Sequence, residues 1–149
     1  MIKDSKWYKD RILWKVNKYK LFDDTICLEF EQLSINQKEY ILRLIPENKI
    51  PVIIFFNDIN KWTLFCSDML FSYDMGELVT ITKEEMYQKF IPTIKKNGNK
   101  IANNQQKKYI RWLYATESKK YIWFPSENAL TVGHSLLKML CKLNTETEA

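Results

Sequence analysis

The chain has 149 residues, of which 46% are hydrophobic and 14% aromatic, and its formal net charge is +5. This length is typical of a single domain with a buried core, and the composition argues against intrinsic disorder. Apolar runs stay well below the roughly 18 residues of a membrane-spanning helix. The N-terminal sequence also lacks the apolar region and cleavage site of a secretory signal peptide.

The charge is unevenly distributed along the chain. Residues 1–20 carry +5, residues 21–87 carry −7, residues 88–120 carry +8 and residues 121–149 carry −1. Such segregation can steer a charged partner towards one surface. The alternative is that the blocks neutralise one another within the fold.

The first predicted element is a helix over Asp4–Lys20, with Asp4 or Ser5 as its N-cap. Its apolar face comprises Tyr8, Ile12, Val16 and Tyr19. The next segment, residues 21–33, is compatible with a strand or a helix, because alternating apolar residues there are mixed with good helix formers. A second helix begins at the capping box Ser34–Gln37 and ends at Pro46. Its apolar stripe comprises Tyr40, Ile41, Leu44 and Ile45.

Residues 49–82 are predicted to form an antiparallel meander of three or four strands, because the turns between them are too short for parallel crossovers. Pro51–Phe56 is uniformly apolar and predicts a strand covered on both faces. Alternation of Trp62, Leu64 and Cys66 with polar residues predicts a half-buried strand. Asp74–Gly76 supplies a turn, and Leu78–Ile81 closes the meander.

Thr82–Glu85 is a further possible capping box, and Pro92 limits any helix there to one or two turns before an extended segment. Residues 97–106 read as a polar loop. Residues 107–124 form a predicted hairpin that turns at 116–118 and ends before Pro125. A final helix, capped by Ser126 or Asn128, precedes a polar tail over 144–149. Its apolar face comprises Ala129, Val132, Leu136, Met139, Leu140 and Leu143.

This order predicts a single α+β domain over residues 1–149, with a mainly helical segment at 1–46 and a strand-rich core with a closing helix at 49–143. The expected architecture is an antiparallel meander and hairpin, with N-terminal helices and one C-terminal capping helix.

No catalytic or metal motif is recognisable. His134, the only histidine, lies within the last predicted helix, where a partly buried structural role is the commoner one. No cysteine and histidine residues have zinc-ligand spacing, and the three glycines form no phosphate-binding loop. The sequence predicts a protein that is not an enzyme and needs no cofactor. Cys27, Cys66 and Cys141, odd in number and set among apolar residues, favour reduced core thiols in a cytoplasm.

Two stretches resemble the pattern of small bacterial pleckstrin-homology-like domains. In residues 62–86 a strand opens with Trp-Thr-Leu and is followed by a short strand and a Gly turn. In residues 119–140 a strand, a proline and a capping helix close the domain. A chain of this size with an additional N-terminal helical segment also resembles the immunity proteins of bacterial toxin systems, including contact-dependent growth inhibition.

The resemblance implies a cytoplasmic, non-enzymatic protein that binds a cognate toxin domain and blocks its active site or substrate access. If the toxin is a nuclease, the acidic block 21–87 is the natural contact surface. The charged residues considered as partner contacts are Asp23, Asp24, Glu29, Glu31, Lys107, Lys108, Arg111, Lys119 and Lys120.

Two other binding functions remain open. The hairpin combines lysines with Tyr109, Trp112, Tyr121 and Trp123 and is compatible with a stacking surface for single-stranded nucleic acid. The basic N-terminal helix is compatible with binding to anionic lipid.

Overall fold

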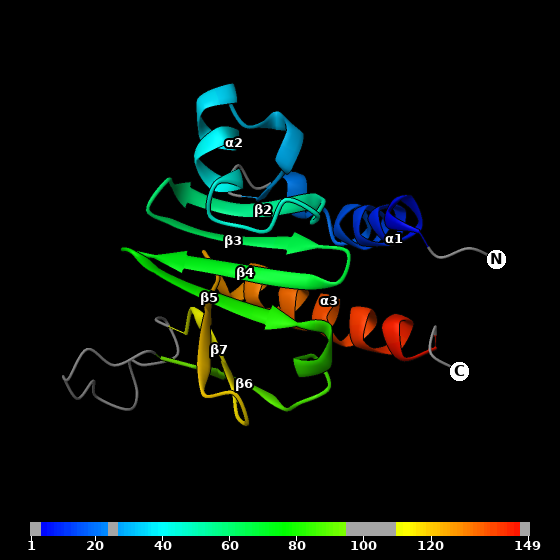
Figure 1. Cartoon of the computed structure of the whole chain (residues 1–149). Helices are drawn as coiled ribbons and strands as arrows, with labels where there is room; N and C mark the ends of the chain where they lie inside the picture. Colours follow the sequence, from blue (N-terminus) through cyan, green and yellow to red (C-terminus); the bar gives the residue numbers. More distant parts are fainter. Residues whose placement is uncertain (1–3, 24–26, 95–109, 147–149) are drawn as a thin grey trace.

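A computed structural model describes residues 4–23, 27–94 and 110–146 of the chain. The fold is α+β, with two antiparallel sheets and, in this part of the chain, three α-helices (Figure 1). The helices are α1 Ser5–Lys18, α2 Ile35–Leu42 and α3 Glu127–Glu146. The predicted order of helices, meander, hairpin and closing helix is therefore confirmed.

The larger sheet follows chain order, which confirms the meander and adds a fifth strand at one edge. Its strands are β1 Cys27–Glu29, β2 Pro51–Asp58, β3 Lys61–Cys66, β4 Met69–Asp74 and β5 Glu77–Thr82. The smaller sheet contains β6 Phe90–Thr93, β7 Trp112–Ala115 and β8 Lys120–Trp123. The short 3-10 turns are η1 Leu21–Asp23, η2 Phe30–Gln32 and η3 Lys83–Glu85.

The central strands of the larger sheet, β2, β3 and β4, are buried on both faces. On one face Ile54, Leu64 and Phe71 pack with residues of η2 and α2. On the other, Ile53, Phe65 and Leu70 pack with α1, α3 and the smaller sheet. Figure 1 shows α3 running behind the sheet and α2 lying beyond β2. The prediction that the strand containing Trp62, Leu64 and Cys66 is half-buried is wrong. In β3, Thr63 and Phe65 are as fully buried as Trp62 and Leu64.

Both predicted N-terminal helices form, with corrected ends. Asp4 caps α1 by accepting a hydrogen bond from the Trp7 N–H at 3.0 Å. Tyr8, Ile12 and Val16 are buried as expected, but Tyr19 is 47% exposed. Tyr19 follows the last helical residue, and a φ of +53° at Lys20 turns the chain away.

The Ser34–Gln37 capping box is present in α2. That helix ends at Leu42, so Leu44 and Ile45 lie beyond it, and Tyr40 is partly exposed. Residues 21–33 are neither one helix nor one strand, since two 3-10 turns flank the short β1 among the residues described there.

The C-terminal helix begins after Ser126, whose Oγ accepts the Ala129 N–H at 3.0 Å. The polar tail was predicted to begin at residue 144, but α3 continues to Glu146. Asn144 is buried within it and donates to the Leu140 carbonyl at 2.8 Å. A side-chain amide that satisfies its own helix can be buried at little cost.

A part-buried polar network joins β5 and η3 to the β7–β8 turn. Glu85 accepts hydrogen bonds from Ser118 Oγ and, at 2.9 Å, from Lys120 Nζ. Lys120 also donates to the Thr80 carbonyl at 2.7 Å. The buried Gln88 amide bonds the Glu117 and Ser118 N–H groups, at 2.8 and 2.9 Å. The 82–85 capping box is present, on a 3-10 turn that leads to the extended β6.

Candidate functional site

The β2–β3 and β4–β5 turns form one exposed end of the larger sheet. They are joined by a hydrogen bond of 2.8 Å from the Met75 N–H to the Asn60 carbonyl. We call this region, Asp58–Asn60 with Asp74–Leu78, the hairpin tip. Three of its side chains are exposed and apolar: Ile59 (39%), Met75 (79%) and Leu78 (37%). Asp58, Asp74 and Glu77 lie among them, so the tip is an apolar patch with acidic neighbours.

Met75 occupies an unfavourable backbone conformation for its residue type. The two-residue turn between β4 and β5 has φ of +47° at Met75 and +91° at Gly76. Turns with two positive φ values strongly prefer Asn, Asp or Gly, because a longer side chain clashes there. A methionine that is strained and also almost fully exposed contributes little to the stability of the fold. Such a residue is a candidate for a binding role.

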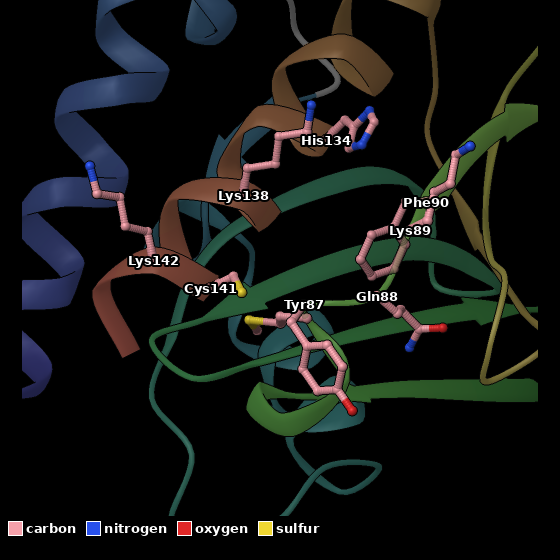
Figure 2. Close-up of a pocket in the computed structure, with 9 residues that line it drawn as sticks. Tyr87, Gln88, Lys89, Phe90, His134, Lys138, Cys141 and Lys142 are labelled. Carbon is pink, nitrogen blue, oxygen red and sulfur yellow. The ribbon is translucent and has the colours of Figure 1, made fainter. Parts of the chain in front are cut away.

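The second candidate site is a hollow of about 420 Å³ between α3 and the segment that links η3 to β6. Figure 2 shows His134, Lys138 and Lys142 in successive turns of α3, with Tyr87 and Phe90 across the hollow. Lys89 also lines it, and among the lining residues that the structure describes there is no carboxylate. We call it the basic pocket. A smaller hollow of about 250 Å³ shares His134 and Lys138 and extends to Pro92 and Leu130.

The surroundings of His134 in the basic pocket disfavour its charged form. Burial lowers the pKa of its imidazole, and the adjacent positive charge of Lys138 lowers it further. Its ring meets Phe90 edge-on, with the ring centroids 6.4 Å apart. The expected partly buried position of His134 is therefore confirmed, but it lies at the wall of a pocket rather than within the core.

The charged residues considered from the sequence are not gathered at one site. Glu29 is half-buried in β1, and the exposed Glu31 makes an ion pair with Lys38 at 3.4 Å. Lys119 is exposed at the β7–β8 turn, and Arg111 donates to the Ile110 carbonyl at 3.0 Å. Lys120 makes an ion pair with Glu85, with Nζ and the carboxylate oxygen 2.9 Å apart. Glu29 and Glu31 thus lie at or beside the β1 edge, and Lys119 and Lys120 lie at the β7–β8 turn. Arg111 lies at the opposite end of that hairpin, where its carbonyl accepts the Phe124 N–H.

Part of that set cannot be placed. Asp24, Lys107 and Lys108 lie outside the described residues, as do Tyr109 and the predicted loop at 97–106. Asp23 ends η1, and its side chain is not described.

Sequence reasoning identified the turn at 74–76 but not its exposed apolar residue. The available signal was a methionine at a position where a two-residue hairpin turn requires positive φ. The basic pocket could not be recognised from the sequence, because Lys89 and Lys138 are about fifty residues apart and only the fold brings them together.

Within residues 4–23, 27–94 and 110–146, no group of His, Cys, Asp and Glu side chains is arranged to hold a metal ion. In the same part of the chain, no helix has both the length and the apolar character needed to cross a membrane.

Comparison of the chain with protein-family models, with curated proteins and with solved structures finds no significant match.

Proposed function

We propose that this protein is a bacterial immunity protein that binds a cognate toxin domain and neutralises it without catalysis. The observation that carries the proposal is the hairpin tip, in which exposed Met75, Ile59 and Leu78 lie among three carboxylates. Protein interfaces commonly combine a small apolar centre with a polar rim, and a few central residues dominate the binding energy. The resemblance of the sequence to immunity proteins supports the same function.

The charge of the tip specifies the kind of toxin surface that would fit. Asp58, Asp74 and Glu77 outnumber Lys61, which is directed over the Trp112 and Trp123 rings at 5.7 and 5.3 Å. Acidic side chains complement a basic protein surface and accelerate encounter with it. The tip belongs to the acidic block 21–87, the contact surface expected if the toxin cuts nucleic acid.

The first test is co-expression with the product of the gene directly upstream, scored by rescue of growth and by co-purification. Rescue together with a stable complex is the expected result. An upstream product that is not toxic and forms no complex contradicts the proposal.

Replacing Met75 with Asn tests the surface. Asn favours positive φ and Met75 is almost fully exposed, so the variant should be as stable as the wild type or more stable by about 0.5 kcal/mol. Affinity for the toxin should nevertheless fall at least about tenfold, as for loss of a central interface residue. Titration calorimetry and thermal unfolding measure the two effects. Ile35→Asn is the matched control, because Ile35 is 70% exposed on α2. If Met75→Asn and Ile35→Asn bound the toxin with equal affinity, the hairpin tip would not be the toxin-binding surface.

A second function, binding of single-stranded nucleic acid, is favoured by one observation. Strand pairing aligns Ile91, Tyr114 and Tyr121 across the smaller sheet, and the two tyrosine rings lie 4.8 Å apart. Aromatic rows on sheets can stack bases. This function predicts binding that weakens steeply with salt, with a log–log slope set by the number of phosphates contacted. Binding through the tip should depend on salt much less.

A further inference from the structure

We propose that the basic pocket is a binding site for a small organic anion, one with an apolar body and at least one phosphate, sulfonate or carboxylate group. This site is separate from the hairpin tip, and the inference does not depend on the proposed function.

The size and lining of the pocket fit such a ligand. A volume of about 420 Å³ lies within the range of small-molecule sites, which are commonly apolar hollows with a few polar groups. Met86 and Phe90 are buried beneath it and supply an apolar floor. Tyr87, 71% exposed, supplies an aromatic wall that a flat apolar body can contact.

The charges of the pocket specify an anion. Lys138 and Lys142 are four residues apart on α3 and so lie on one face of the helix. Lys89 lines the opposite wall, although its exposed side chain is directed away from α3 (Figure 2). None of the described residues that line this hollow is a carboxylate, and the nearby Glu85 is already bonded to Ser118 and Lys120. An anionic group would therefore meet the positive charge of Lys138 and Lys142 at the mouth of a partly apolar hollow.

Because His134 lines the pocket, its titration should respond to ligand binding there. The ionisable groups around the pocket are Tyr87 and Lys89 on the β6 side and Lys138, Cys141 and Lys142 on α3. In the free protein, burial and Lys138 both lower the pKa of His134. A bound anion stabilises the imidazolium and must raise that pKa, so binding should tighten as the pH falls through the histidine titration.

The experiment is proton NMR of the His134 ring, which is unambiguous because the chain has one histidine. The probe is benzene-1,3-disulfonate, which keeps its charge throughout the histidine titration. Saturable shifts of the His134 resonance and a raised His134 pKa are expected. Sulfate, which has no apolar body, and benzyl alcohol, which has no charge, should each bind much more weakly.

Two substitutions of exposed residues test the walls of the pocket. Lys138→Gln should weaken binding of the disulfonate about tenfold, the effect of losing one charged hydrogen bond. Tyr87→Ser should weaken it without changing net charge. Lys119→Asn is the matched control: it removes one positive charge at the β7–β8 turn, where φ of +57° suits Asn. No response of His134, equal binding of sulfate and disulfonate, or equal effects of Lys138→Gln and Lys119→Asn would each overturn the proposal.

Discussion

Gly133 shows how a single residue permits close packing in this fold. It lies in the middle of α3, and a Cβ placed there would overlap the Phe124 ring. Phe124 is fully buried and packs edge-on against Phe55, with the ring centroids 5.2 Å apart. A Cβ at position 133 would therefore force this ring, or the helix, to move against buried neighbours. Glycine is a poor helix former, but the absence of a side chain at Gly133 lets α3 approach Phe124 at the end of β8.

Replacing Gly133 with Ala should destabilise the protein despite the better helix propensity of alanine. The expected loss is about 1–3 kcal/mol, the usual cost of overpacking a core, against a gain of about 1 kcal/mol from propensity. Urea unfolding followed by circular dichroism measures the difference. Thr131→Ala, on the exposed side of the same helix, is the control and should have almost no effect. If Gly133→Ala were stabilising, the close approach of Phe124 would be disproved.

At the scale of elements, Glu85 fixes the position of the smaller sheet relative to β5 and η3. Burial opposes ionisation of its carboxyl group, but hydrogen bonds from Ser118, Lys120 and the Thr82 backbone outweigh that effect and lower its pKa to about 2. The same contacts use Lys120 within the molecule, so this lysine contributes less positive charge to the hairpin surface than its sequence suggests.

The Glu85 network predicts a specific loss of stability in acid. Folding lowers the pKa of Glu85 from 4.5 to about 2, so the unfolded chain binds this proton more tightly. The stabilisation is complete above about pH 4.5 and is lost as the pH falls towards 2. Glu85→Gln should lower the free energy of unfolding at pH 7 by about 1–3 kcal/mol. Denaturant unfolding at several pH values measures both effects.

The control for that series is Glu84→Gln, because Glu84 is exposed in the same 3-10 turn. It should retain both the stability and the acid dependence of the wild type. If Glu85→Gln showed the same acid dependence as the wild type over this pH range, the network would not be its source.

At the scale of the whole molecule, a buried polar contact joins the two sheets. The Thr63 hydroxyl donates to the Trp123 carbonyl, and Ser72 Oγ accepts the Trp123 N–H at 3.1 Å. The two hydroxyl oxygens are 2.9 Å apart, so Ser72 donates its own proton to Thr63. The backbone at the end of β8 is thus hydrogen-bonded to side-chain hydroxyls of β3 and β4, strands with which β8 is not paired.

Thr63→Val should lower the stability of the entire fold, because it leaves the Trp123 carbonyl and the Ser72 hydroxyl buried without these partners. The expected cost is about 1–3 kcal/mol. Tryptophan fluorescence and circular dichroism should report one shared unfolding transition, shifted to lower denaturant. Thr63→Ser retains the hydroxyl group and should recover most of the loss. Separate transitions for the two signals would show that the sheets unfold independently.

Local sequence determined much of the architecture. Asp4, Ser34 and Ser126 cap their helices, as the sequence allowed. Each side-chain oxygen accepts the N–H three residues later, so the interaction depends on neighbouring residues alone. The strands and tight turns of the meander also followed from local pattern, and Pro125 ends the hairpin as expected. The α+β class follows from the order of these elements.

Only the tertiary structure decided which surfaces are available for binding. The sequence pattern placed Tyr19 on a buried face and Thr63 on an exposed one, whereas Tyr19 is exposed and Thr63 is fully buried. It also offered Lys120 as a partner contact, whereas Lys120 is paired with Glu85 within the molecule. Their positions depend on packing between segments far apart in the chain, which periodicity cannot report. The basic pocket and the hairpin tip arise for the same reason, since each combines side chains from separate elements. Local pattern set the elements of this protein, and long-range packing set its candidate sites.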